Sequence, residues 1–398
     1  MWPALMSAKR ALIKTSLTFA LAAERVLRGR RVVADVDGVR SVLVLEYMLP
    51  LGCCVHLTPL FEAIRQGRPD ISITVATRGI GAALLRHHPF IDHLIETPDP
   101  LVDVRGTVRV LLRELLERGI APDCVLTGLS DSRTRISLVG ALAVSGWRGG
   151  FTLAPELYQL PLERCGDLSL IDNNLRVAGL LGCETGHLEP LVFFSAADVA
   201  SAEAIVREVN PEGRPLMVMV TQNSGGQRTG WHAERLVQVV RHASEVLGCA
   251  VAYVGTQGDS AAVEELRAAA GGVGTSLTGR TSVTELAALL AMSDFVVSLD
   301  TGTMHVGRAV GVPMVVLGPS WQRPLEWLPM GIPQVRILRG EDQEGIPDGY
   351  RLDEISAEDV IGALTDLVGS YPASAVARAG RVERHTSGVD HLKADKKK

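Results

Sequence analysis

The chain has 398 residues, of which 46 % are hydrophobic and 21 % are charged, a globular composition that excludes disorder over most of its length. Its formal net charge is −5, from 40 Lys and Arg against 45 Asp and Glu, and aromatic residues make up only 4 %. These values argue against a nucleic-acid-binding protein, which would be basic and rich in stacking side chains. At about 100–200 residues per domain, the length predicts two or three domains.

Cysteine spacing and hydropathy give two further exclusions. The six cysteines show no C-x-x-C spacing, so the sequence predicts neither a zinc site nor a thioredoxin-like motif and fits a reducing cytoplasm. No uncharged run of about 18 residues occurs, and we therefore expect no membrane-spanning helix.

The first 31 residues form a basic amphipathic stretch with seven Lys and Arg against one acidic residue, Glu24. Such a stretch is suited to lie on an anionic membrane surface, which would make this a cytoplasmic protein bound peripherally to the inner membrane. The alternatives are a solvated helix packed on the body and a loose leader. We treat residues 1–37 as a separate basic leader.

From residue 41, short apolar runs alternate with helical patterns, which is typical of βαβ units and a parallel sheet. In the first half we expect strands at Ser41–Leu45, Ile71–Ala76, Leu94–Glu96, Cys124–Leu126 and Gly149–Leu153, and helices at Cys53–Gln66, Gly81–His87 and Asp172–Leu181. The turn-forming sequence N-P-E-G-R-P at residues 210–215 predicts a domain boundary. The N-terminal domain therefore comprises residues 38–210.

The same alternation restarts after the boundary. We expect strands at Leu216–Thr221, Ala250–Val254, Phe295–Leu299 and Met314–Leu317, and helices at Trp231–Leu247, Ser260–Ala270, Val283–Met292, Thr303–Val310 and Leu364–Val368. The C-terminal domain comprises residues 211–370, and the polar tail at 371–398 is predicted to be disordered. Two doubly wound α/β domains in tandem predict ligand binding in a cleft, beyond the carboxyl ends of the strands.

The sequence S-L-D-T-G-T-M-H at residues 298–305 lies between a predicted strand and a short predicted helix. Gly302 permits close approach of a ligand, and the N–H groups at the helix start favour an anion such as a phosphate or diphosphate. His305, one turn further, can donate a hydrogen bond to the same anion. The alternative is a simple helix cap by Asp300 or Thr301 beside a structural histidine.

Residues 295–319 resemble the signature of glycosyltransferase family 9, the heptosyltransferase family of lipopolysaccharide assembly. That signature reads approximately D-S/T-G-x-x-H-x-A-x-x-x-G-x-P, then an apolar strand and G-P-T/S; here Gly307 replaces the usual Ala, and G-P-S at 318–320 matches. Further segments that resemble the family follow one another in order, at Ser41–Arg65, Pro69–Thr77, Thr221–Arg235 and Gly279–Ser282. The resemblance extends over about residues 41–368.

The resemblance implies a GT-B fold, in which two Rossmann-like domains face each other across a cleft. It implies inverting transfer of a sugar, classically heptose from an ADP-sugar, to an acceptor bound mostly by the first domain, without a metal or other cofactor. The donor diphosphate would lie on Thr301, Gly302 and His305, while Asp300 orders the turn or touches the sugar.

Two further donor contacts follow from the resemblance. Ser224 and Gly225 match the family's phosphate loop, and Asp259 falls where the family has an acidic residue on the ribose hydroxyls. A carboxylate can accept both hydrogen bonds of a ribose diol. A solvated loop aspartate is the alternative reading of Asp259.

The chain departs from the family at the general base. The family has G-D in its first turn, where this chain has Gly52 and Cys53. An ordinary thiol is almost entirely neutral at pH 7. Glu46, at the end of the first strand, and His56, one helical turn after Cys53, are the substitutes. We rank Glu46 before His56 and His56 before Cys53.

The second departure lies in the phosphate loop, where the family has Lys and this chain has Thr229. A departing diphosphate needs a positive partner. Arg228 is adjacent and can supply a forked donor, and we choose it over Arg308 and Arg323.

Together these features predict an inverting glycosyltransferase that moves a heptose or hexose from a nucleotide diphosphate onto a glycolipid or oligosaccharide in cell-surface polysaccharide assembly. The two departures leave open a catalytically silent nucleotide-sugar-binding or scaffold protein of the same fold. A nucleotide-sugar epimerase ranks lower, because no set of carboxylates is arranged to abstract a sugar-ring proton. An NAD-dependent dehydrogenase ranks lowest, because no G-x-G-x-x-G opens either domain.

Overall fold

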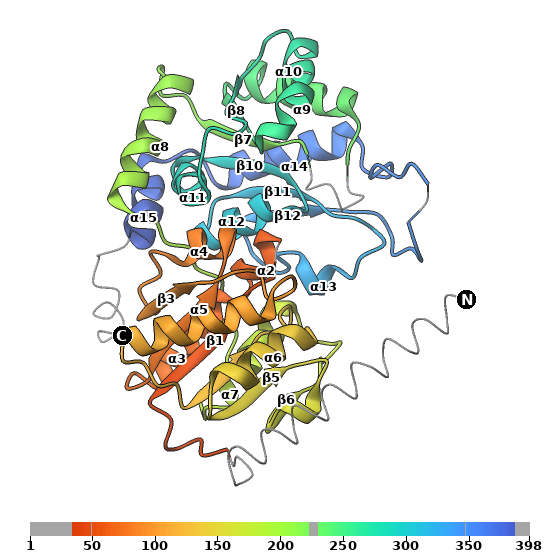
Figure 1. Ribbon diagram of the computed structural model, residues 1–398. Coiled ribbons are helices and arrows are strands. Elements are labelled where there is room, and N and C mark those ends of the chain that lie inside the picture. Colours follow the sequence, from red (N-terminus) through yellow and green to blue (C-terminus); the bar gives the residue numbers. More distant parts are fainter. Residues whose placement is uncertain (1–33, 49, 223–229, 347, 387–398) are drawn as a thin grey trace.

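The computed structural model describes residues 34–48, 50–222, 230–346 and 348–386. Within them lie two six-stranded sheets, one in each half of the chain (Figure 1). The strand orders are β3-β2-β1-β4-β5-β6 and β12-β11-β10-β7-β8-β9, and every pair is parallel. The predicted α/β class with two Rossmann-like units is confirmed.

The first half contains the strands β1 (Ser41–Leu45), β2 (Ser72–Thr77), β3 (His93–Glu96), β4 (Cys124–Thr127), β5 (Trp147–Phe151) and β6 (Leu160–Leu162). Its helices are α2 (Leu51–Val55), α3 (Thr58–Gly67), α4 (Gly79–Leu85), α5 (Val104–Glu117), α6 (Thr134–Ala143) and α7 (Leu170–Gly179), with a 3₁₀ turn at Pro155–Leu157. All the strands predicted for this half are present, with ends shifted by a few residues. Helices α5 and α6 were not predicted.

The central strand β1 is apolar and buried from Val42 to Leu45 because both faces of the sheet are covered. Val42 and Val44 pack into the core on the α3 and α7 side, while Leu43 and Leu45 pack into a separate core with residues of α5 and α6. Successive side chains of a strand point to opposite faces, so a strand buried on both faces has a continuous apolar sequence.

The single helix predicted at Cys53–Gln66 is instead two helices, α2 and α3. Pro59 lies in the first turn of α3, where its missing N–H costs nothing, and the hydroxyl of Thr58 donates to the carbonyl of Val55 at 2.8 Å. The chain therefore breaks at His56, which ends α2. This break holds His56 against the second half of the protein.

The second half contains β7 (Leu216–Val220), β8 (Ala250–Val254), β9 (Thr275–Ser276), β10 (Phe295–Leu299), β11 (Met314–Leu317) and β12 (Val335–Leu338). Its helices are α9 (Ala233–Glu245), α10 (Ser260–Ala269), α11 (Val283–Met292), α12 (Gly302–Val310), α13 (Pro324–Trp327) and α14 (Ala357–Ser370), with a 3₁₀ turn at Gln257–Asp259. Helix α8 (Ala196–Val209) precedes the predicted boundary, yet it packs against α11. By packing, α8 therefore belongs to the second half.

The prediction of a disordered tail at 371–398 is wrong for α15 (Ala375–His385), a helix that packs against α11 (Figure 1). Its basic residues have buried partners. Arg378 forms an ion pair with the buried Asp294 at 2.6 Å, and Arg381 donates to the carbonyls of Ala291 and Ser293. The polar sequence suggested that this segment is solvated, but its arginines bind carbonyl and carboxylate groups at the C-terminal end of α11.

The end of α15 also contacts the segment that links the two halves. The Phe194 amide donates to the His385 carbonyl at 3.0 Å, and Phe194 forms a parallel bridge with Thr386. Residues 387–398 and most of the predicted leader, residues 1–33, lie outside the described residues. In the described ranges no single helix is long and apolar enough to cross a membrane, and only α14 and α15 taken together, with a 90° bend between them, have the length and composition of a span.

We predict that Arg378→Ala lowers the free energy of unfolding by about 1–3 kcal/mol, because it leaves a buried carboxylate without its cation. Urea unfolding of the full chain measures this. Arg384→Ala, at an exposed position of the same helix, is the matched control and should change stability by less than about 0.5 kcal/mol. Equal effects of the two substitutions would mean that the ion pair does not hold α15.

Candidate functional site

The two halves of the protein meet where α2 contacts α12 (Figure 1). Helix α12 starts directly after β10, as predicted, and Gly311 ends it in the left-handed conformation with φ 72°. We call the contact between the turn into α2 and the start of α12 the seam. It lies beyond the carboxyl ends of β1 and β10, where ligands of such sheets bind.

Two glycines allow the close approach at the seam. A Cβ at Gly52 would lie 2.9 Å from Nε2 of His305 and closer still to its Cδ2. A Cβ at Gly302 would lie 2.9 Å from Cβ of Leu51. Real Cβ atoms do not approach neighbours this closely, so both positions require glycine. In this structure α2 covers the start of α12.

Three of the residues predicted to bind the donor diphosphate come together at the start of α12, and each has a hydrogen-bonding atom that is not used. Oδ1 of Asp300, Oγ1 of Thr301 and Nδ1 of His305 are buried and have no hydrogen-bond partner within the described part of the chain. Thr301 is the N-cap residue, but its side chain makes no capping bond. Buried polar atoms are normally paired, and a group of unpaired ones indicates a ligand. The simple helix cap is therefore not what the structure contains.

Burial controls the charges of this group. It raises the pKa of Asp300 to about 6. Burial, with a smaller effect of Arg308, lowers the pKa of His305 to about 3. Nε2 of His305 lies 3.7 Å from Oδ1 of Asp300. At neutral pH the histidine is therefore uncharged, and Asp300 is mostly ionised.

His56 lies against the same group from the other side of the seam. Its ring contacts that of His305 edge-on, with centroids 4.4 Å apart and an interplanar angle of 83°. It also stacks on Trp327 of α13, with centroids 5.4 Å apart at 27°. The contact with Trp327 was not foreseen, because nothing in the sequence reports which side of the short α13 faces the seam.

Glu46, the first-ranked candidate base, is 2 % exposed at the end of β1. The hydroxyl of Thr77 donates to its carboxylate at 2.5 Å. Burial raises the pKa of Glu46 to about 7, although hydrogen bonds from Thr77 and Cys54 oppose the rise. The carboxyl therefore titrates near neutral pH.

A second buried carboxyl, missed from the sequence, belongs to Asp131 in the loop after β4. It accepts from the amides of Tyr47 at 2.8 Å and Met48 at 3.1 Å, and so fixes the chain just before the seam. Burial and the nearby Glu46 raise the pKa of Asp131 well above its usual range. The available signal was an aspartate in the loop that follows an apolar strand.

Cys53, the third candidate base, is half-buried in α2. Burial raises the pKa of its thiol to about 11, so the thiol is neutral at physiological pH. The position taken by Asp in the family pattern therefore carries no charge here.

The remaining predicted residues lie apart from this group or outside the described residues. The residues that lie outside the described part of the chain are Ser224, Gly225, Arg228 and Thr229. The carboxylate of Asp259 accepts from the amide and hydroxyl of Thr256, at 2.7 and 2.8 Å, in a capping box at the end of β8. Of the rejected cations, Arg308 is bound to Glu189 at 2.7 and 3.0 Å, and Arg323 is exposed.

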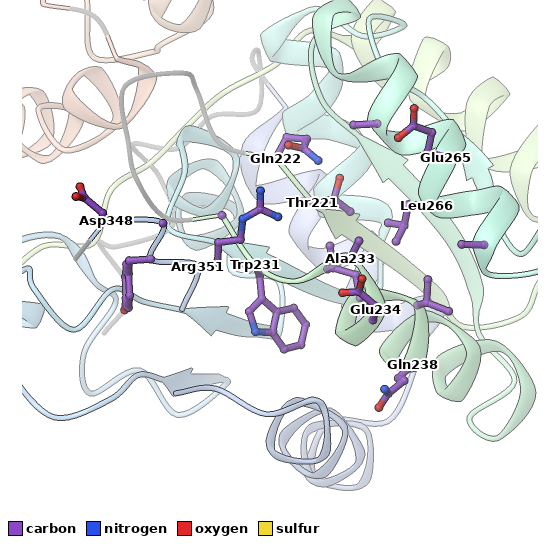
Figure 2. A pocket seen from close by; sticks show the side chains of 17 residues that line it. Thr221, Gln222, Trp231, Ala233, Glu234, Gln238, Glu265, Leu266, Asp348 and Arg351 are labelled. Atoms are coloured by element: carbon purple, nitrogen blue, oxygen red, sulfur yellow. The ribbon is translucent and has the colours of Figure 1, made fainter. Parts of the chain in front are cut away.

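A cavity of about 990 Å³ opens between α9 and α10 at the end of β7 (Figure 2). Its polar lining includes Thr221, Gln222, Glu234, Glu265 and Arg351. Gln222 and Gly230 border the segment that contains the predicted phosphate loop. Within the described ranges, no three His, Cys, Asp or Glu side chains group as a metal site.

Comparisons with known proteins address the family and the fold of the chain. Residues 177–343 match the model of glycosyltransferase family 9 (heptosyltransferase). A solved glycosyl transferase family 9 protein from Veillonella parvula DSM 2008 is 20 % identical, with a TM-score of 0.73 over 83 % of this chain and 97 % of that one. A search of the curated proteins finds no match.

Two Escherichia coli structures are also similar. ADP-heptose lps heptosyltransferase II is 18 % identical, with a TM-score of 0.68 over 84 % of this chain and 100 % of that one. Heptosyltransferase WaaC, solved with ADP, is 15 % identical, with a TM-score of 0.62 over 83 % and 99 % of the two chains. These likenesses confirm the GT-B fold expected from the sequence.

We predict that Gly52→Ala lowers the free energy of unfolding by about 1–3 kcal/mol, because its methyl group overlaps the His305 ring and forces the seam apart. Gly362→Ala is the control, since it lies in α14 with open space around its Cβ position. That change should stabilise by about 0.5–1 kcal/mol. If Gly52→Ala were as benign as the control in urea unfolding, the close packing of α2 on α12 would be wrong.

The raised pKa of Glu46 predicts a pH dependence of stability. A carboxyl whose folded pKa is about 7 and whose unfolded value is near 4.5 stabilises the fold fully below pH 4.5, and that stability is lost as pH rises to 7. Between pH 5 and 8 the free energy of unfolding of the wild type should fall by roughly 2–3 kcal/mol, whereas Glu46→Gln should not show this decrease. Urea unfolding across this range measures the difference.

The matched control for this measurement is Glu184→Gln, which changes an exposed carboxyl. It should follow the wild type at every pH. Parallel stability curves for the wild type and Glu46→Gln would show that Glu46 is ionised in the fold at pH 5, contrary to its burial.

Proposed function

We infer that the chain, whose residues 177–343 match the model of glycosyltransferase family 9, is a member of that family. We propose that it transfers a heptose or hexose from a nucleotide diphosphate to a hydroxyl of a glycolipid or oligosaccharide, inverting the anomeric carbon, without a metal. The reaction would serve lipopolysaccharide-type assembly. The observation that carries the proposal is the group of unpaired buried atoms of Asp300, Thr301 and His305 at the start of α12. A negatively charged diphosphate suits such a helix start.

The donor that we propose is an ADP-sugar. Its diphosphate would accept hydrogen bonds from the amides of Gly302 and Thr303 and from the side chains of Thr301 and His305. Asp300 would face the sugar. Support for adenine comes from the similar fold of Escherichia coli proteins whose names include ADP-heptose and ADP. Because α2 covers the start of α12, donor entry would require the seam to open.

The general base that we propose is Glu46. In the transfer, the acceptor hydroxyl passes its proton to the Glu46 carboxylate while its oxygen bonds to the anomeric carbon. The bond from that carbon to the donor phosphate breaks, and the nucleoside diphosphate leaves. A base whose pKa is about 7 is suited to this step at neutral pH. Its location just before the seam supports the role.

For the basic leader at residues 1–31 we propose contact with the anionic cytoplasmic face of the inner membrane, where a glycolipid acceptor would be found. Sedimentation with anionic vesicles tests this, because a chain lacking the leader should remain in solution. Sedimentation of both chains, or of neither, would contradict it.

A catalytically silent nucleotide-sugar-binding protein is the second candidate, because Cys53 is a neutral thiol where the family pattern has Asp. This candidate predicts donor binding without transfer or hydrolysis. A transfer assay with ADP-, GDP-, UDP- and dTDP-sugars separates the two functions.

We predict that two substitutions separate donor binding from proton transfer. His305→Ala should raise the donor dissociation constant and lower kcat by about 10²–10³-fold, because it removes a diphosphate ligand. Glu46→Gln should lower kcat by about 10²–10⁴-fold with little change in donor affinity. Calorimetry gives the affinities, and product chromatography gives the rates.

His242→Gln, on the second half's α9 and away from the seam, is the control for both variants. Wild-type affinity and turnover in His305→Ala would show that the donor binds elsewhere. Wild-type turnover in Glu46→Gln would exclude Glu46 as the base.

A further inference from the structure

The proposed donor site gives no role to the buried histidine that the first half places at the seam. His56 is 1 % exposed, and neither Nδ1 nor Nε2 of its ring has a hydrogen-bond partner within the described part of the chain. An imidazole normally uses at least one of its nitrogens when buried. Two unused nitrogens on one ring, at a contact between domains, indicate a polar ligand that reaches the ring from the seam.

The backbone fixes His56 in this position. Its amide donates to the carbonyl of Gly52 at 2.9 Å, and its carbonyl accepts from Nδ2 of Asn174 at 3.0 Å. The other side of the Asn174 amide accepts from the amide of Leu129 at 2.8 Å. The His56 backbone is thus held from two elements. Its ring stacks on Trp327, and its edge-on neighbour is His305 of the second half. The histidine is positioned before any ligand binds.

The charges around the two rings are already engaged. The cation that acts on both is Arg308, and Glu189 binds its guanidinium at 2.7 and 3.0 Å. Glu189 is in turn bridged to Asp172 by His187. Asp300 adds a carboxylate 3.7 Å from His305. Among the described residues around the two rings, a diphosphate that entered the seam would therefore meet two neutral imidazoles rather than an available guanidinium.

We propose that His56 and His305, one from each half of the protein, form a paired-imidazole receptor for the donor diphosphate, and that the pair takes up one proton when the donor binds. The inference rests on the proposed function and adds to it a residue, His56, and a coupling to protons. Where the family has a lysine, this chain has Thr229. In this arrangement the positive charge comes instead from the proton on the histidine pair, which is taken up only when the ligand is present.

The proton uptake follows from elementary electrostatics. Burial, with the neighbouring His305 and Arg308, lowers the pKa of His56 well below its usual range, so both rings are neutral in the free protein. A diphosphate brings opposite charge within hydrogen-bonding distance and favours the protonated ring. Two rings with centroids 4.4 Å apart do not both ionise, so the pair shares one proton. Asp300 is the competing acceptor, because a nearby diphosphate also favours its neutral form.

Calorimetric titration of the full chain with ADP-glucose at pH 7 tests the proposal. Both phosphates of this probe are esterified, so the ligand itself does not titrate near pH 7. Titrations in buffers of different ionisation enthalpy give the number of protons bound per ligand. We expect the wild type to take up about 0.5–1 proton, in keeping with one shared site.

The variants locate that proton. His56→Gln should lower the uptake to about 0.2 proton or less. It should also weaken ADP-glucose binding about tenfold, because one charge-assisted hydrogen bond is lost. Asp300→Asn should retain the uptake. His242→Gln, on α9 and away from the seam, should behave as the wild type. His56→Asn provides a second, smaller replacement, and thermal unfolding of each variant shows that the protein used is folded.

Three results would overturn the proposal: binding by the wild type without proton uptake, uptake in His56→Gln equal to that of the wild type, or loss of uptake confined to Asp300→Asn. The first measurement needs no variant. If ADP-glucose does not bind, the GDP-, UDP- and dTDP-sugars replace it. Binding by none of them would overturn the proposed function as well, whereas binding and transfer without proton uptake would overturn only the histidine pair.

Discussion

Two glycines permit helix α2 of the first half to contact helix α12 of the second, and the candidate chemistry of the protein depends on this contact. Gly52 makes room for the His305 ring, and Gly302 makes room for Leu51. The close approach removes water from Asp300, Thr301, His305 and His56 together. Water removal strengthens every later interaction of these groups with a charged ligand, because the local dielectric constant is low.

Burial in the seam also explains the unusual ionisation of the site. It keeps both histidines neutral, and burial just before the seam raises the pKa values of Glu46 and Asp131. Titratable groups shifted by burial in one place are typical of functional sites. The departure at Cys53 is consistent with this picture, because the proposed base, Glu46, is a carboxyl that lies seven residues earlier.

The fold was largely predictable from the sequence, since strands of parallel sheets buried on both faces are continuous apolar runs. The strands Ala250–Val254, Phe295–Leu299 and Met314–Leu317 lie where predicted. Helix α15 was missed because its arginines read as solvated, whereas Arg378 and Arg381 bind groups far away in the chain. Such tertiary partners leave no periodic pattern. The break at His56 was missed for a different reason, since Pro59 is compatible with the first turn of a helix as well as with its interruption.

The candidate site was predictable only where residues adjoin a strand end. Asp300, Thr301, Gly302 and His305 come from one such segment, and the structure brings them together. Trp327 and Asp131 come from other segments, and their proximity to the seam depends on how the two halves pack. Asp259, which the resemblance assigns to the ribose, lies in the 3₁₀ turn after β8, where its carboxylate takes part in a local cap.

The account is tested most directly by a crystal structure of the chain with ADP-glucose or the nucleotide sugar that binds most tightly. We expect the diphosphate on the backbone amides of Gly302 and Thr303, within hydrogen-bonding distance of His305 and His56, with Leu51 displaced from Gly302 at the start of α12. A well-ordered donor bound elsewhere, for example in the cavity between α9 and α10, with the seam still closed, would contradict the account.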